Sequence, residues 1–254
     1  MTARIIAVAN QKGGVAKTTT TVAVAAALAE TGRRVLVVDM DPQGALTYSL
    51  GVDPDSLDDT VNDVLVRRLP VTQVVLEREV DLVPANIDLA GAEAVLLGKT
   101  GREYALQRAL RDVQDRYSHI LIDCPPSLGI LTINALTAAG EVVIPLQCEA
   151  LSHRGVGQLL ETLGDIRHFT NPDLAVTGVI PTMFDGRSRH AQQVLTDVGE
   201  RYGVKVFEPP VRKSIRFAEA AQAGRSILSF APGHPGAEAY RAIATAIEEG
   251  TGDG

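Results

Sequence analysis

The sequence predicts one α/β domain, built as a doubly wound, mostly parallel sheet flanked by helices. Short apolar runs alternate along the chain with longer segments of helical periodicity, which is the pattern of successive βαβ units. Acidic residues follow two of these runs, at the strand ends where open α/β sheets bind their ligands. A length of 254 residues suits one large domain. We expect this domain to span residues 1–250 and residues 251–254 to form a frayed tail.

The first three elements are predicted to be a strand, a helix and a strand. Residues 5–9 are continuously apolar, as is typical of a central strand that is covered on both faces. Residues 18–30 are rich in alanine and threonine and predict a helix, which Gly32 ends as a C-terminal cap. Residues 35–38 form the next apolar run and predict a second buried strand.

The pattern of apolar runs and helical periodicity is weaker in the middle of the chain. We expect short helices between residues 53 and 76 and a strand at residues 80–84. Residues 103–117 carry apolar side chains at helical spacing and predict an amphipathic helix. Residues 119–123 are apolar up to a final aspartate, and the two prolines that follow prevent this strand from continuing. Further along, the same two patterns predict strands at residues 142–146 and 176–183, and helices at residues 151–169, 189–202 and 237–249.

The loop after the first strand carries the strongest functional signal. Residues 10–19 read Asn-Gln-Lys-Gly-Gly-Val-Ala-Lys-Thr-Thr and lie between a strand and a helix. The backbone N–H groups of such a loop, and the N-terminus of the helix, favour phosphate groups. Lys17 is placed to reach the β- and γ-phosphates, and the Thr18 hydroxyl to bind Mg²⁺. The usual P-loop pattern has glycine where this chain has Gln11 and Ala16, so a glycine-containing turn before an ordinary helix is the alternative.

We therefore predict an ATP–Mg²⁺ site. Its nucleotide-binding residues are Lys12, Gly13, Gly14, Val15, Ala16, Lys17, Thr18 and Thr19. Asp123 is predicted to hold Mg²⁺ through water, and Asp39 to lie in the same outer shell, so that the predicted metal site is Thr18, Asp39 and Asp123. Asp41 is predicted to orient or activate the attacking water. An aspartate at a strand end is also a common turn or cap residue, which is the alternative for each of the three taken singly.

Composition argues against several other classes of site. The net charge is −7, and the scarcity of aromatic residues, with no Trp, argues against a base-stacking platform for single-stranded nucleic acid. The two cysteines form no Cys-x-x-Cys pair, and the five histidines show no metal-ligand spacing. No signal peptide is visible, and no apolar stretch approaches the roughly 18 residues of a membrane span. A reducing cytoplasm fits this composition best.

These motifs together resemble the ParA/MinD family of ATPases with a deviant Walker A motif. Residues 38–44, Val-Asp-Met-Asp-Pro-Gln-Gly, look like its switch I segment, and residues 121–127, Leu-Ile-Asp-Cys-Pro-Pro-Ser, look like its Walker B and switch II segments. The resemblance implies that Asp41 supports hydrolysis. It also implies that Lys12 is the signature lysine of the family, which reaches across the interface of an ATP-dependent dimer to the phosphates of the partner subunit. Asp41 and Lys12 are therefore the predicted catalytic residues. The family usually has glycine in place of Ala16, where we expect a negative φ because the left-handed region is costly for a residue with a Cβ.

Within the family, the chain looks like the short ParA/Soj-type partition ATPases. MinD-type members end in a basic amphipathic helix that binds membrane, whereas this C-terminus is acidic and rich in glycine, so we expect no membrane role. The Fe–S branches need cysteines at an interface or tail, whereas Cys124 and Cys148 follow buried strands and look like core residues.

The resemblance implies an ATP-dependent homodimer that binds double-stranded DNA non-specifically and segregates a chromosome or plasmid. Its ATP hydrolysis is expected to be weak until a ParB-like partner stimulates it, and it is expected in the cytoplasm, associated with the nucleoid. The alternatives are a nucleoid-using ATPase that positions a protein cargo, a MinD-like positioning ATPase, and a metabolic P-loop enzyme, for which the sequence shows no second cluster of polar residues.

Basic residues gather in one part of this acidic chain. Residues 181–225 hold eight Lys or Arg against five Asp or Glu, whereas residues 1–180 hold fifteen against twenty-two. The predicted DNA-binding residues are Arg187, Arg189, Arg212, Lys213 and Arg216, with Arg225 in the same stretch. A solvated surface with scattered charge is the alternative. By resemblance, Arg216 matches a position implicated in non-specific DNA binding, and residues 211–214 replace a segment that lies near the adenine.

Overall fold

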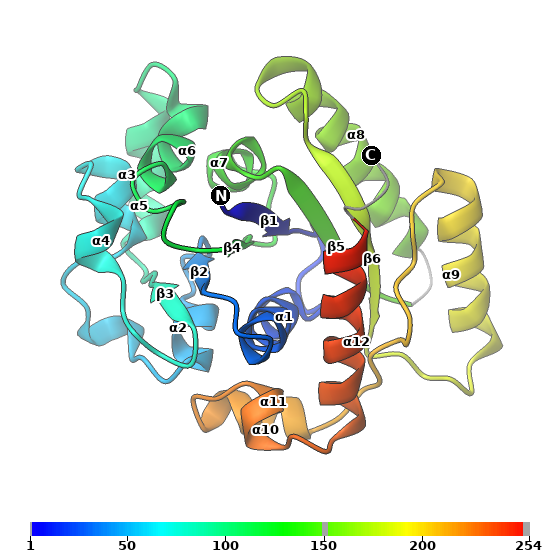
Figure 1. The fold of residues 1–254 in the computed structure, drawn as a ribbon. Helices are drawn as coiled ribbons and strands as arrows, with labels where there is room; N and C mark the ends of the chain where they lie inside the picture. The colour runs from blue at the N-terminus through cyan, green and yellow to red at the C-terminus, as the bar shows by residue number, and fades with distance from the viewer. Residues whose placement is uncertain (1, 149–151, 251–254) are drawn as a thin grey trace.

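The computed structural model describes residues 2–148 and 152–250. Its centre is a six-stranded sheet in the order β3-β2-β4-β1-β5-β6, in which every pair of neighbouring strands is parallel (Figure 1). The strands are β1 (Arg4–Val8), β2 (Val35–Asp39), β3 (Asp81–Val83), β4 (His119–Asp123), β5 (Glu141–Gln147) and β6 (Ala175–Thr182). The predicted doubly wound parallel sheet is confirmed.

Helices cover both faces of the sheet, and each face has its own apolar cluster. One face packs against α1 (Lys17–Glu30), α2 (Ala45–Ser49), α10 (Arg216–Gln222), α11 (Ile227–Phe230) and α12 (Pro235–Glu249). The other packs against α3 (Val61–Val66), α4 (Val71–Val74), α5 (Leu89–Leu97), α6 (Ala105–Leu110), α7 (Ile130–Ala138), α8 (Ser152–Phe169) and α9 (Arg189–Tyr202). Two short 3-10 turns, Pro54–Ser56 and Arg102–Tyr104, complete the described elements. All five residues of β2 and of β4 are buried, which is why residues 35–38 and 120–122 are continuously apolar.

The amphipathic helix predicted at residues 103–117 is much shorter in the structure. Only α6 is α-helical there, and residues 111–116 continue as turns. The carbonyl O of Gln114 accepts the N–H of Ala3 at 3.0 Å, so this stretch bonds to the chain entering β1 instead of continuing the helix. Tyr117 is buried, and its hydroxyl donates to Asp81 Oδ2 at 2.8 Å. These tertiary contacts override the local periodicity.

Five helices lie where the sequence predicted none: α2, α5, α7, α10 and α11. The clearest case is α7, whose residues are buried almost all round, so that no apolar stripe marks it in the sequence. The predicted helix at 151–169 matches α8 from Ser152 onward, and its first residue lies outside the described residues. The predicted tail, residues 251–254, also lies outside them. None of the described helices is long and apolar enough to cross a membrane.

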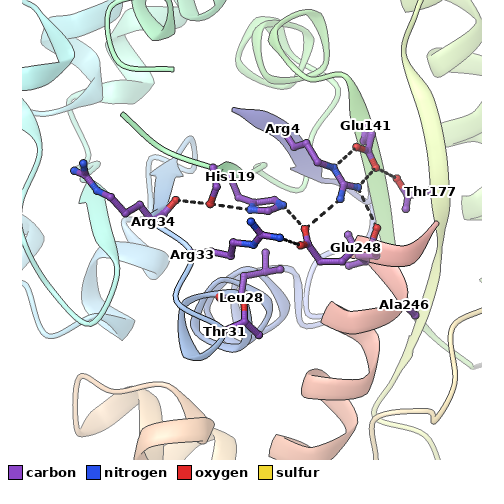
Figure 2. Close-up of polar contacts among 12 residues, drawn as sticks. Arg4, Leu28, Thr31, Arg33, Arg34, His119, Glu141, Thr177, Ala246 and Glu248 are labelled. Carbon is purple, nitrogen blue, oxygen red and sulfur yellow. Dashed lines mark hydrogen bonds and ion pairs between the residues drawn. The ribbon is translucent and has the colours of Figure 1, made fainter. Parts of the chain in front are cut away.

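Charged side chains join the amino ends of the central strands to the last helix (Figure 2). Arg4 forms a two-point ion pair with Glu141, with Nε–Oε1 and Nη2–Oε2 distances of 3.0 Å. Arg4 Nη1 also lies 3.3 Å from Glu248 Oε1, in the last turn of α12. His119 Nε2 lies 2.7 Å from the same oxygen, and Arg33 Nη2 lies 3.0 Å from Glu248 Oε2. This cluster fixes the end of α12 at the edge of the sheet opposite the carboxyl ends of the strands.

Candidate functional site

The predicted phosphate loop lies at the carboxyl edge of the sheet, between β1 and α1. Asn10 orders its first half, because its Nδ2 donates to the carbonyl O of Pro145 at 2.7 Å and its Oδ1 accepts the N–H of Lys12 at 3.0 Å. Val15 is buried, and its carbonyl O accepts a hydrogen bond from Thr182 Oγ1 at 3.0 Å. The loop is thus fastened to β5 and β6. Neither Asn10 nor Thr182 was predicted from the sequence to have a role in the loop.

The middle of the loop faces solvent. Lys12, Gly13 and Gly14 are exposed, and Gly14 has a φ of 71°, which glycine adopts without a steric penalty. A loop that is tied at its ends and open at its glycines leaves its backbone accessible to a ligand.

The prediction that Ala16 has a negative φ is wrong. Ala16 has φ 66° and ψ 34°, in the left-handed region, and it directly precedes the first residue of α1. Its carbonyl O accepts the N–H of Thr20 at 2.9 Å, while Val15 on its other side is fixed by Thr182. The chain must therefore turn sharply at this one residue, and the contacts on both sides outweigh the local preference of alanine.

Lys17 begins α1, and its side chain folds back over the loop. Its Nζ donates to the carbonyl O of Lys12 at 3.2 Å, and the residue is only 8% exposed. Burial lowers the pKa of Lys17, while the negative charges nearby, chiefly that of Asp123, oppose this shift. Phosphate oxygens at the loop would be stronger acceptors than a carbonyl and would favour the charged amine.

Thr18 and Asp123 are in direct contact, as a shared magnesium site requires. Thr18 Oγ1 donates to Asp123 Oδ2 at 2.7 Å, and Thr21 Oγ1 donates to Oδ1 at 3.1 Å. Burial raises the pKa of Asp123 to about 8, and the charge of Asp39 adds to this effect. A divalent cation beside Thr18 would reverse that balance in favour of the carboxylate.

The residues present fit Mg²⁺. Mg²⁺ is usually held by one or two carboxylates together with phosphate oxygens and water. Across residues 2–148 and 152–250, no group of three or more His, Cys, Asp or Glu side chains could hold a metal alone. A metal at Thr18 and Asp123 would accordingly complete its coordination with the phosphates of the nucleotide.

Asp39 is fully buried beside Asp123, its partner in the strand register, but its oxygens are directed to the chain that follows β2. Its Oδ2 accepts the N–H and the Oγ1–H of Thr47, at 2.9 and 2.7 Å, and its Oδ1 accepts the N–H of Asp41 at 3.1 Å. Burial raises the pKa of Asp39 to about 6, although these hydrogen bonds act to lower it. In this arrangement Asp39 orders the segment that carries Asp41, and its role at the metal stays a prediction. Thr47, which was not predicted from the sequence to belong to the site, also accepts the N–H of Ala85 at 2.9 Å.

Asp41 is half-buried at the turn after β2. Its Oδ1 accepts the N–H of Gln43 at 2.9 Å, and the turn closes where its carbonyl O accepts the N–H of Gly44, also at 2.9 Å. Its charge also acts on Lys17, so the two side chains belong to one electrostatic neighbourhood. Among the described residues, the second Asp41 oxygen accepts no hydrogen bond, so it is available to a water.

A cavity of about 380 Å³ continues from the loop. Gly14, Ala16 and Thr19 line it on the loop side, and Met183 and Phe217 are among the residues opposite. Its volume is in the range of small-molecule sites. A larger cavity of about 720 Å³ lies between α3, α5 and α6 and is lined by four basic side chains, Arg68, Lys99, Arg102 and Arg108. This second polar cluster corrects the expectation that the chain has none, and no residue of the phosphate loop lines it.

The residues predicted to bind DNA are all exposed, but they fall into two groups. Arg212 and Lys213 line the cavity next to the loop, and Arg216 follows them at the start of α10. Arg187 and Arg189 lie at the start of α9. The N–H of Phe184 donates to the carbonyl O of Val211 at 2.9 Å, so the chain leading to α9 runs beside the segment that carries Arg212.

The parallel sheet, with a lysine-bearing loop between β1 and α1 and a buried aspartate at the end of the neighbouring strand, defines a P-loop nucleotide-binding protein. The chain matches the AAA domain family over residues 3–176. It is 44% identical to the sporulation initiation inhibitor protein Soj of Bacillus subtilis, over 96% of this chain and 98% of Soj. It is 42% identical to the chromosome partitioning protein ParA of Myxococcus xanthus, over 94% of this chain and 86% of ParA. The chain therefore belongs to the ParA/Soj family of P-loop ATPases.

Solved structures agree with this fold. The cobyrinic acid a,c-diamide synthase of Mycobacterium smegmatis with bound ADP and magnesium is 50% identical, with a TM-score of 0.87 over 97% of this chain and 94% of that one. The same protein is known with an ATP analogue and magnesium. The cell division ATPase MinD of Pyrococcus furiosus is 25% identical, with a TM-score of 0.79 over 97% of this chain and 99% of MinD. The predicted ATPase class is confirmed, a positioning ATPase is supported, and the ligands of these relatives accord with the predicted cofactors, ATP and Mg²⁺.

Proposed function

We propose that this protein is an ATP-dependent dimerising switch that binds DNA non-specifically and drives chromosome or plasmid partition. It hydrolyses ATP weakly until a ParB-like partner stimulates it, and it works in the cytoplasm on the nucleoid. The observation that carries the proposal is the identity to Soj and ParA over nearly the whole chain, combined with a phosphate loop that brings Lys17, Thr18 and Asp123 together.

Nucleotide binding is the first step, and Lys17 is its most direct test. Lys17→Ala removes a charged donor from the loop, and a charge-assisted hydrogen bond is worth about 1.5–3 kcal/mol. The variant is expected to bind ATP–Mg²⁺ at least tenfold more weakly in calorimetric titrations. Unchanged affinity would refute the phosphate-loop assignment.

Dimerisation is the second step, and Lys12 is the residue that tests it. Lys12 lies on the exposed part of the loop, so its side chain is accessible to the face of a second copy. Lys12→Ala should stay monomeric with ATP in sedimentation velocity, while the parent protein forms a dimer. Lys205→Ala, which changes another exposed lysine that does not line the cavity next to the loop, is the matched control. An ATP-bound Lys12→Ala dimer as stable as the parent would exclude the model in which two copies enclose the nucleotide.

DNA binding is the third step, and it must overcome a net charge of −7 per chain. Each phosphate contact contributes about −0.9 to the slope of log K against log salt, so the few contacts that one copy offers bind weakly at physiological salt. Two copies joined by ATP would double these contacts and align them. Whether ATP or ADP is bound would thereby decide whether the protein binds DNA, without any conformational change passing through the core.

Arg216 is available for such a contact. Its Nη1 lies 2.7 Å from Glu219 Oε2, and both side chains are exposed, a type of ion pair that contributes about 0–1 kcal/mol. A DNA phosphate can therefore replace Glu219 at little cost. We expect sequence-independent binding with ATP, loss with ADP, weakening by salt, and a large loss in Arg216→Ala but not in Arg111→Ala on the opposite face. Equal binding with ATP and ADP, or an unaffected Arg216→Ala, would favour a switch that acts on protein partners alone.

The 50% identity to a cobyrinic acid a,c-diamide synthase supports a second candidate, an enzyme that amidates carboxylates. The cavity with four basic side chains has the charge to bind a polycarboxylic acid. However, a carboxylate that ATP activates must lie in line with the terminal phosphate, and no residue of the phosphate loop lines this cavity. Amide transfer from glutamine further needs a reactive thiol, whereas Cys124 is buried and burial raises the pKa of Cys148 to about 11. ATP turnover that rises with cobyrinic acid and glutamine, but not with DNA and a ParB-like protein, would establish this candidate instead.

A further inference from the structure

A second candidate site lies apart from the phosphate loop, in the cavity of about 720 Å³ between α3, α5 and α6. No residue of the loop lines this cavity, and Figure 1 shows its three helices on the side of the molecule away from α9. Its volume is in the range of ligand sites. The proposed partition function assigns no ligand to it.

The cationic side chains of this cavity are held in place by main-chain carbonyl groups. Lys99 Nζ donates to the carbonyl O of Val66 at 2.7 Å. Arg102 and Arg108 donate through Nη1 to carbonyl groups at the end of α5 and in the turn that follows, at 2.8 and 3.1 Å. A carbonyl group orients a cation but does not neutralise it. Among the described residues, Arg102 is paired with Glu103, whereas no acid pairs with Lys99 or Arg108. These two cations therefore keep their charge for a ligand.

The fourth cationic residue, Arg68, occupies a position that favours glycine. It follows the end of α3, where the N–H groups of Arg67 and Leu69 both donate to the carbonyl O of Asp63, at 2.9 and 3.1 Å. Its φ of 60° lies in the left-handed region, which is costly for a residue with a Cβ and is usually taken by glycine after a helix. The backbone conformation thus gives no reason for an arginine here, whereas a negatively charged ligand in the cavity does.

Most of the other residues that line the cavity are apolar. Val64, Leu65 and Leu96 are buried at its wall, and on either side of Leu96 the helix α5 exposes Val95 and Leu97. A ligand that fits this surface has apolar groups as well as negative charges. An inorganic anion has no apolar group. A nucleic acid would need aromatic side chains on which to stack its bases, and none lines the cavity. An acidic peptide with apolar side chains has both features.

We propose that this cavity is a docking site for an acidic segment of a partner protein that alternates carboxylate and leucine-like side chains. Its carboxylates pair with Arg68, Lys99 and Arg108, and its apolar side chains pack against the wall that contains Leu96. The single acid among the described lining residues, Asp112, is exposed and opposes this ligand. The docking site is thus separate from the site that binds nucleotide.

Fluorescence anisotropy with three labelled peptides of equal length tests the chemistry of the ligand. The first is three repeats of Glu-Leu-Leu-Glu, the second has serine in place of each leucine, and the third has lysine in place of each glutamate. We expect saturable binding of the first, binding at least about tenfold weaker of the second because the leucines are no longer buried, and no saturable binding of the third. No saturable binding of the first peptide, or equal binding of the first and the second, would overturn the proposal.

Variants of the lining residues test the place of binding. Arg68→Gly and Arg108→Gln should each weaken the first peptide about threefold, as for an exposed ion pair, and the double variant about tenfold. Asp112→Asn should tighten it. Arg78→Gln, which changes an exposed arginine outside the cavity, is the matched control and should bind like the parent. Parent-like affinity in the double variant, or weaker binding in Asp112→Asn, would overturn the proposal.

Two further measurements separate this site from misfolding and from the proposed function. Arg68→Gly gives the turn its preferred residue, so its melting temperature should not fall although its peptide affinity does. Lys17→Ala should bind the first peptide like the parent, whatever its affinity for ATP. A loss of peptide affinity in Lys17→Ala would locate the peptide at the phosphate loop, and a loss of DNA binding in Arg68→Gly would assign the cavity to nucleic acid. Either result would overturn the proposal.

Discussion

Ala16→Gly is expected to stabilise the protein, although it removes a methyl group from the phosphate loop. Ala16 has a φ of 66°, and the left-handed region costs a residue with a Cβ about 1–2 kcal/mol. Glycine removes this cost but increases the entropy of the unfolded chain, an opposing effect of about 0.4–1 kcal/mol. The net gain is about 0.5–1 kcal/mol, which corresponds to a rise of about 1–4 °C in melting temperature for a domain of this size.

Thermal unfolding followed by circular dichroism, without nucleotide and with ADP–Mg²⁺, measures this gain. Ala242→Gly is the matched control, because Ala242 is exposed in the middle of α12. There the same change should destabilise by about 1 kcal/mol. A melting temperature of Ala16→Gly below that of the parent would refute the account of strain at the start of α1. An increase only with ADP–Mg²⁺ would show that the left-handed turn forms when nucleotide binds.

Three further substitutions test other parts of the structure. Thr47→Val removes a hydroxyl donor from buried Asp39 and an acceptor from the backbone N–H of Ala85. Urea unfolding should therefore show a free energy of unfolding lower by about 2–3 kcal/mol, whereas that of Thr47→Ser should stay close to the parent's. Asp41→Ala should keep ATP affinity within about twofold and lower turnover about 100-fold, as measured by phosphate release; parent-like turnover would remove Asp41 from the mechanism. Burial lowers the pKa of His119, so its contribution to stability is present above the unfolded-state pKa of 6.5 and is lost as the pH falls below it. His119→Gln should therefore flatten the stability curve between about pH 7 and 5, whereas exposed His168→Gln should not.

The sheet could be predicted from the sequence because its strands are covered on both faces. Continuous apolar runs such as those of β2 and β4 are short, bounded by turn residues and different from the helical period, so they reveal their structure locally. The aspartates that end β2 and β4 are paired in the register, as the prediction of a shared edge requires. By contrast, α7 is buried almost all round, and its sequence carries no apolar stripe that would mark a helix.

The finer parts of the site depend on contacts that no local pattern encodes. The positive φ of Ala16 results from fastening on both sides, one of which comes from Thr182 in the last strand of the sheet. Thr47 donates a hydrogen bond to Asp39 and accepts one from the N–H of Ala85, which lies far along the chain. Ser214, which lines the cavity next to the phosphate loop, likewise bonds to His234, and the two residues lie in loops that border α10 and α12. Each of these residue types is common in turns, so the sequence alone gives no reason to select it.

The pairing of Arg4 with Glu248 has a practical consequence for following this protein in cells. It brings positions near both ends of the described chain to one edge of the sheet, opposite the edge that carries the phosphate loop (Figure 2). A fluorescent tag joined beyond residue 250 would thus leave the loop open to nucleotide and to a second copy. The linker should begin after residue 250, because a deletion that reached Glu248 would remove the carboxylate that pairs with Arg4, Arg33 and His119.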